Sequence, residues 1–200
     1  MVAGVARAST RSRPFLRRKR RARATPQVPS RTGAAGYARA MDTPPGFLDH
    51  ELAEAAFVCD LIRVRDLLAR GASPDARDGE GRPPLVSAIL GNSVALVGLL
   101  LESKADVNAT DPHGWTPLHF AAEEVLPQMA SLLVAKGADP NVRDDAGNTP
   151  LHRAVFSARG RDEVVRILRK AGARDDVKNK AGETPKSLAE RLGENVFTSN

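Results

Sequence analysis

Two histidines at equivalent positions are the first candidates for chemistry in this sequence. His119 and His152 lie 33 residues apart, and each ends a Thr-Pro-Leu-His segment. Imidazole is a common metal ligand and proton carrier, so two facing rings could hold a metal ion. A structural role is favoured instead, because each His follows by three residues a Thr that can cap a helix, and its ring can hydrogen-bond back to that cap. We therefore expect neither a metal nor a cofactor.

The other reactive side chains do not form a catalytic set. Glu123 and Glu124 are adjacent, so on a helix their side chains diverge by about 100°, which favours a solvated helix end over a carboxylate pair. Cys59 is the single cysteine, which excludes an intramolecular disulfide and a cysteine-based zinc site, and we interpret it as an unreactive thiol. No Gly-rich phosphate loop, Gly-x-Ser-x-Gly or zinc-protease motif is present. The sequence therefore predicts a protein that is not an enzyme.

The Thr-Pro-Leu-His segments are interpreted as helix starts. Thr116 can cap the first turn, and Pro117 stands where its missing N–H costs nothing. The pattern predicts one helix over 116–124 and a second over 127–136, with Gly137 in the left-handed conformation after it. The apolar residues expected to be buried between stacked units are Leu118, Ala121, Leu132 and Leu133.

This helix pair is one copy of a repeat. Asp-x-x-Gly recurs at Asp78, Asp111 and Asp144 with a period of 33 residues, and 182–185 begins a further copy. Over residues 48–193 the period and the Thr-Pro-Leu-His motif resemble the ankyrin-repeat family. The resemblance implies an all-α helical solenoid, in which each unit is a helix pair with a projecting hairpin. Stacked units bury one continuous core.

The repeats differ from one another. We predict units at about 48–77, 78–110, 111–143 and 144–178, a half-repeat cap at 179–193 and a tail at 194–200. The unit at 78–110 lacks both the Thr and the His, and it carries Lys104 where Gly is expected, so we expect it to be the weakest. The unit at 144–178 is two residues longer, with the excess at 157–161 between its helices. The residues expected to face inward in the cap are Leu188, Ala189 and Leu192, with Gly193 ending the helix.

The net charge of +6 conceals an uneven distribution along the chain. Residues 1–40 carry eleven Lys/Arg and no acid, so the remainder has a net charge of −5. We interpret 1–46 as a disordered basic tail, because it has no sustained apolar pattern. Its meaning stays open. The Arg-rich stretch 7–23 could bind nucleic acid or an anionic surface, or serve as a nuclear or organelle address, or translation could begin at Met41.

In the family that the sequence resembles, a partner usually lies along the hairpin tips and the first helices, in a concave groove. Trp115 is singled out because it is the only Trp, packing does not dictate its position, and Trp is enriched in binding hot spots. Its ring could instead lie over a hairpin. The insertion 159–161 is a second candidate contact, on the convex side. The candidate partner-binding residues are Arg77, Glu80, Arg82, Thr110, Asp111, His113, Trp115, Phe120, Glu123, Arg143, Asp145, Asn148, Arg153 and Phe156.

The predicted function is that of a non-catalytic protein-binding module, monomeric and cytoplasmic unless the tail directs it to the nucleus or an organelle. One alternative is a nucleic-acid or anionic-surface adaptor acting through the Arg-rich tail. Another is a bacterial chaperone or immunity-type protein that neutralises a neighbour-encoded partner. No apolar run in the sequence is long enough to span a bilayer.

Overall fold

The computed structural model describes residues 46–197, which contain nine α-helices and no strand. The tail predicted at 1–46 lies outside the described residues except for its last position. The helices are α1 (Phe47–Phe57), α2 (Leu61–Ala69), α3 (Pro84–Leu90), α4 (Val94–Glu102), α5 (Pro117–Glu123), α6 (Pro127–Ala135), α7 (Pro150–Ser157), α8 (Glu163–Lys170) and α9 (Pro185–Leu192).

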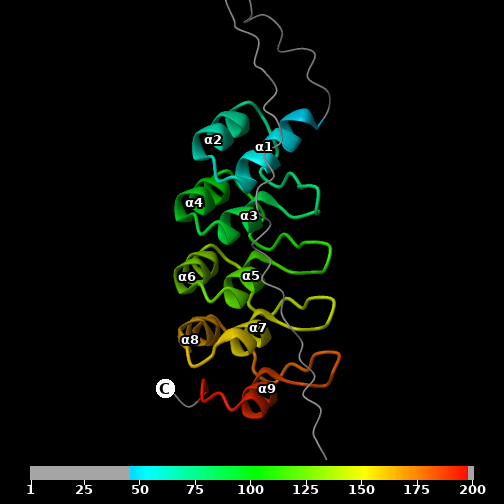
Figure 1. The fold of residues 1–200 in the computed structure, drawn as a ribbon, viewed down its shortest axis with the longest axis vertical. Helices are drawn as coiled ribbons and strands as arrows, with labels where there is room; N and C mark the ends of the chain where they lie inside the picture. The colour runs from blue at the N-terminus through cyan, green and yellow to red at the C-terminus, as the bar shows by residue number, and fades with distance from the viewer. Residues whose placement is uncertain (1–45, 198–200) are drawn as a thin grey trace, which may run out of the picture. The chain divides into compact units, whose positions relative to one another are not determined.

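The helices stack in two rows. An inner row is formed by α1, α3, α5, α7 and α9, each of which contacts the next, and α2, α4, α6 and α8 lie beside it as an outer row (Figure 1). Before each inner helix from α3 onward, the chain forms a hairpin that projects away from the outer row (Figure 1). The predicted all-α solenoid of helix pairs, closed by a single helix, is confirmed.

The core runs through every layer of the stack. Leu52, Leu85, Leu118 and Leu151 recur every 33 residues, and each is fully buried. Burying such a side chain contributes roughly 1.5–3 kcal/mol relative to leaving it in water. Of the other residues expected to be buried, Ala121 and Leu133 are fully buried, whereas Leu132 is only partly so.

The unit at 78–110 carries the two irregularities that its sequence predicts. Pro83 occupies the cap position of α3 and makes no side-chain cap hydrogen bond. Lys104 has a φ of 70°, the left-handed conformation that disfavours residues with a Cβ. The first helix of this unit therefore begins without the cap that stabilises its equivalents in the next two units.

The C-terminal end differs from the expectation. Leu188 and Ala189 are buried, and Gly193 ends α9 with a φ of 71°, both as predicted. The prediction for Leu192 was wrong, because 39% of its surface is exposed. Val196, in the segment predicted to be a tail, is 2% exposed and belongs to the core. The chain therefore closes the stack with the segment after α9 as well as with the helix itself.

Candidate functional site

The start of α5 shows the structural role of the Thr-Pro-Leu-His histidine. The backbone N–H of Thr116 donates to His119 Nδ1 at 3.1 Å, and Thr116 Oγ1 lies 2.8 Å from the same nitrogen. Because a backbone N–H can only donate, Nδ1 is the acceptor and the ring carries its proton on Nε2. The predicted helix cap is confirmed, and it fixes the imidazole as the neutral tautomer.

The second ring nitrogen ties each unit to the next one. His119 Nε2 donates to the carbonyl of Asn148 at 3.1 Å, and His152 Nε2 donates to the carbonyl of Glu183 at the same distance. Burial lowers the pKa of His119 to about 4 and also lowers the pKa of His152. Both rings are therefore neutral at pH 7. They couple units rather than facing each other as a pair of metal ligands.

The hairpins share one turn geometry. In the hairpin before α5, Asp111 Oδ1 accepts the backbone N–H groups of His113 and Trp115, both at 2.8 Å. Gly114 adopts a φ of 77°, and a Cβ added there would lie 3.2 Å from Cα of Asp144 in the next hairpin. The turn and the close approach both require glycine at this position. Asp78, Asp144 and Asn179 make the corresponding pair of hydrogen bonds in the other hairpins.

A second set of hydrogen bonds runs from unit to unit beside the hairpins. The side-chain oxygens of Asp75, Asn108 and Asn141, spaced 33 residues apart, each accept a backbone N–H of the following unit at 2.9 Å. The donors are Asp106, Asp139 and Arg174. We call these three bonds the side-chain ladder. It holds the units at a constant offset.

Trp115 lies at the centre of an aromatic and charged cluster. Its ring centroid is 5.1 Å from that of Phe120, and the guanidinium carbon of Arg153 lies 4.1 Å from the Trp115 centroid. Phe120 belongs to α5 and Arg153 to α7, so the half-buried indole spans two units. Glu123 and Phe156 lie one turn further along these helices. We refer to Trp115, Phe120, Glu123, Arg153 and Phe156 as the Trp115 cluster.

Within this cluster, Arg153 is held in place by a buried acid. Arg153 Nη2 donates to Asp144 Oδ2 at 2.5 Å, and the Asp144 side chain is 1% exposed. Burial would raise the pKa of Asp144, but hydrogen bonds from Arg153 and Asn148 outweigh it and hold the pKa below its ordinary value. The ion pair therefore positions the guanidinium over the indole.

Two polar atoms of the cluster lack partners among the described residues. These are Arg153 Nε and Glu123 Oε2, both inaccessible to solvent. Burial also raises the pKa of Glu123, although Arg153 and a hydrogen bond to Ser157 act against that shift. Leaving a buried polar atom unpaired lowers the stability of the fold by about 1–3 kcal/mol. Unfavourable arrangements of this kind are often found at functional sites.

The predicted contact residues fall into three groups by exposure. Arg82 is 8% exposed, and Asp78 and Glu80 bind its guanidinium at 2.9 Å, so it holds its own hairpin together. The half-buried residues are Thr110, Asp111, Trp115, Phe120, Glu123, Asn148 and Arg153. The exposed residues are Arg77, Glu80, His113, Arg143, Asp145 and Phe156.

Two of the exposed arginines connect neighbouring hairpins. Arg77 Nη1 donates to the carbonyl of Thr110 at 2.5 Å, and Arg143 Nη2 donates to that of Lys178 at 2.8 Å. Their guanidinium groups are therefore fixed in place before any partner arrives.

Sequence reasoning missed an exposed apolar group at the first unit. Phe57 and Val58 are 64% and 65% exposed at the end of α1, and Ile62 at the start of α2 is 84% exposed. The signal was available, since three large apolar residues fall within six positions outside the inward-facing pattern of Leu52, Ala55 and Ala56.

Cys59 fills space between two units. Burial raises the pKa of its thiol, which keeps it protonated at neutral pH. A Cβ added to Gly91 would lie 2.3 Å from Cys59 Sγ, so the sulfur packs closely against that glycine. Within residues 46–197 no group of three or more His, Cys, Asp and Glu is placed to hold a metal ion. None of the helices in this range is long and apolar enough to cross a bilayer.

Comparison with known proteins agrees with this architecture. Residues 52–144 match the family model for ankyrin repeats in three copies, and residues 146–180 match the model for an ankyrin repeat. A stretch of 78 residues, 38% of this chain, is 42% identical to a protein of Homo sapiens, Arf-GAP with coiled-coil, ANK repeat and PH domain-containing protein 3. The match spans 9% of the length of that relative.

Proposed function

Because the chain belongs to the ankyrin-repeat family, we propose that it is a non-catalytic, monomeric module that holds a protein partner on its hairpin face. The hairpin face consists of the hairpins at 77–82, 110–115 and 143–148 and the exposed sides of α1, α3, α5 and α7. Ankyrin repeats are generally protein-interaction modules, and the family is generally non-catalytic. A fold alone does not determine a partner, so the choice of partner depends on the residues of this face.

The observation that carries the proposal is the Trp115 cluster. Phe156 leaves 49% of its surface exposed one turn from Arg153, whose guanidinium is fixed by Asp144 and stacked on Trp115. Aromatic and Arg side chains supply much of the binding energy in protein interfaces, and they do so best when their geometry is already fixed. Phe156 is therefore the side chain of this cluster that a partner contacts first, and Trp115 with Arg153 supports it.

The test is capture of protein partners from the native cell by the full chain, read by mass spectrometry. Phe156→Ser should lose the partner while unfolding at the wild-type temperature, because the exposed ring contributes little to the core. Val94→Ser is the matched control, since Val94 is 37% exposed on α4 in the outer row. The proposal fails if Phe156→Ser and Trp115→Ala, both folded, retain every partner that the wild type captures.

The Arg-rich stretch 7–23 favours a second candidate, an adaptor for nucleic acid or an anionic surface. Its Lys/Arg residues occur without a single acid in residues 1–40. Binding of this kind weakens steeply with salt, because phosphate contacts release counterions. A chain beginning at Met41 should then lose binding to a DNA or RNA duplex, whereas loss of the protein partner in the same chain would argue against the hairpin face.

A further inference from the structure

The first unit carries a hollow on the hairpin face. It has a volume of about 520 Å³ and lies between α1 and the hairpin that precedes α3. Phe57 and Val58 line it, and about two thirds of the surface of each remains exposed. Large apolar side chains gathered at one exposed place mark interaction sites. The hollow therefore offers an apolar wall to a ligand.

The charged groups around the hollow leave its rim negative. Arg63 is paired with Glu51 at 2.5 Å, and Arg82 is shared between Asp78 and Glu80, both at 2.9 Å. With Glu54, four carboxylates thus face two guanidinium groups, which leaves an excess of two negative charges. The carboxylate side chains of Glu54 and Glu80 remain 60% and 59% exposed, although His50 Nε2 lies 3.5 Å from Glu54 Oε1 and Arg82 binds Glu80. Residues 46–110 as a whole carry ten Asp/Glu against six Lys/Arg.

We infer that this hollow takes a segment of a protein partner in which an apolar side chain is flanked by Arg or Lys. The apolar side chain packs on Phe57 and Val58, and the flanking cations pair with Glu54 and Glu80. Exposed ion pairs of this kind add modest affinity, select the partner and speed its arrival, and the apolar contact supplies further affinity. The inference rests on the proposed function, since it names the kind of segment that the same face holds.

A synthetic peptide tests this directly with the full chain. The probe is fluorescein-labelled Gly-Arg-Phe-Leu-Arg-Gly, followed by fluorescence anisotropy at about 0.15 M salt. We expect saturable binding that Glu54→Lys weakens about tenfold, because an attraction becomes a repulsion. Phe57→Ser should weaken binding similarly. A peptide with Glu in place of both Arg should bind the wild type weakly and gain affinity for Glu54→Lys.

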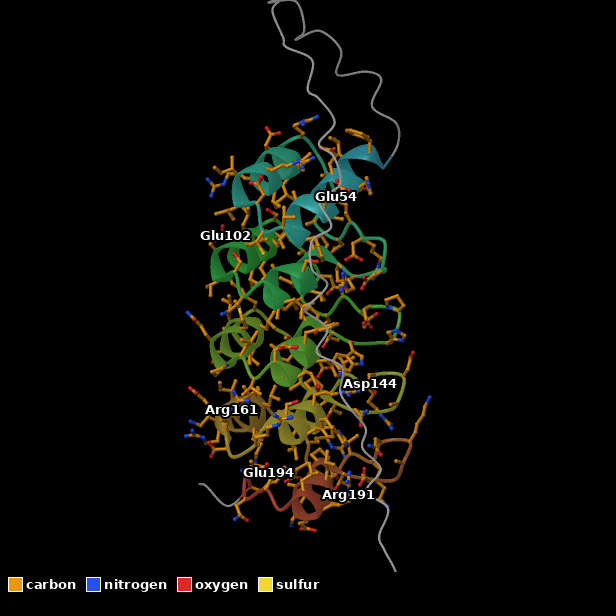
Figure 2. The ribbon with its side chains drawn as sticks, viewed as in Figure 1. Glu54, Glu102, Asp144, Arg161, Arg191 and Glu194 are labelled. Atoms are coloured by element: carbon orange, nitrogen blue, oxygen red, sulfur yellow. The ribbon has the colours of Figure 1, made fainter. Side chains whose placement is uncertain are left out.

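Glu102→Lys is the matched control. Glu102 is exposed on α4 and lies on the outer-row side of the stack, whereas Glu54 lies on α1 (Figure 2). Equal weakening by both charge reversals would overturn the inference, as would an absence of saturable binding. Light scattering provides a further check on the wild type and on Val58→Asp. If the wild type is a dimer and Val58→Asp dissociates it, the occupant is a second copy of the chain and the inference is overturned. These variants leave Phe156 intact, so their outcome is independent of the capture experiment.

Discussion

At His119, the scale of a single residue, two functions depend on one protonation state. Nδ1 accepts the N–H of Thr116 while Nε2 donates to Asn148 in the next unit. A second proton would have to enter at Nδ1, where it would face the backbone N–H and break the helix cap. Burial reinforces this, since a charged ring would lose its hydration. The neutral form is thus a condition of stacking at this interface.

Acid is therefore expected to weaken the fold. The pKa of His119 is about 4 in the folded chain and near 6.5 when unfolded, so the unfolded chain binds the extra proton first. The stabilisation that the neutral His119 ring provides is complete above about pH 6.5, and it is lost as the pH falls towards 4. Lowering the pH from 7.5 to 5 should cost about 2 kcal/mol from this residue, with a further loss in the same direction from His152.

His119→Gln is the informative variant, because Gln can still accept the cap hydrogen bond but does not titrate. Urea unfolding at the two pH values should show a smaller difference than in the wild type. His113→Gln, which changes an exposed histidine of the preceding hairpin, should keep the wild-type difference. An unchanged pH dependence in His119→Gln would contradict the assigned role.

The sequence could predict only half of this histidine's role. The cap bond joins residues three apart, and helix geometry fixes such spacing. The bond from Nε2 crosses 29 residues to Asn148 and depends on how the units stack. Trp115 illustrates the same limit. Its residue type made it a candidate for binding, but its contact with Arg153 of α7 depends on the offset between two units.

Among the elements, α3 lacks both parts of this arrangement. Val86 occupies the position of His119, and Pro83 occupies that of Thr116. Because Pro has no backbone N–H, a histidine at 86 alone would find no donor for Nδ1. With Thr at 83, the same histidine would gain the cap bond and could donate from Nε2 to the carbonyl of Trp115, which is the position equivalent to Asn148.

We therefore predict that Pro83→Thr with Val86→His raises the free energy of unfolding by about 1–2 kcal/mol. Val86→His alone should lower it, because it buries an imidazole without a cap. The two substitutions are thus strongly non-additive, which a double-mutant cycle in urea measures. Additive effects would mean that the histidines of the other units stabilise the fold independently of the preceding Thr.

The ends of the stack were harder to predict than its middle. Helical periodicity placed Leu192 with Leu188, but only inner units have neighbours on both sides. Leu192 is exposed, and Val196, after the helix, is buried instead. At the other end, Phe57 and Val58 lie outside the inward-facing pattern of α1 and are exposed. The packing of an inner unit can be predicted from the repeat, because it has an equivalent neighbour on each side. A terminal unit has such a neighbour on one side only.

For the whole molecule, the unequal interfaces predict unequal local stability. Histidine ties run from α5 and from α7 to the following unit, but α3 has none. In a linear stack, each unit depends on its own stability and on its neighbours. The backbone amides of α3 and α4 should therefore exchange with solvent sooner than those of α5 to α8.

Hydrogen exchange followed by mass spectrometry measures this difference. Pro83→Thr with Val86→His should slow exchange in α3 and α4 and leave α8 nearly unchanged. Uniform exchange across all four helix pairs would indicate that the stack opens as one unit, contrary to the prediction.

The side-chain ladder constrains where extra residues can be inserted into this chain. Each of the two middle units supplies a donor to the unit before it and an acceptor to the next, as Asp106 and Asn108 do in the second unit. A complete extra unit, duplicated between 110 and 111, would bring its own acceptor and donor and would keep the ladder continuous. The two extra residues of the fourth unit lie between α7 and α8, and the bond from Arg174 to Asn141 persists. In this chain the extra residues thus lie in a turn within a helix pair, where they leave the side-chain ladder intact.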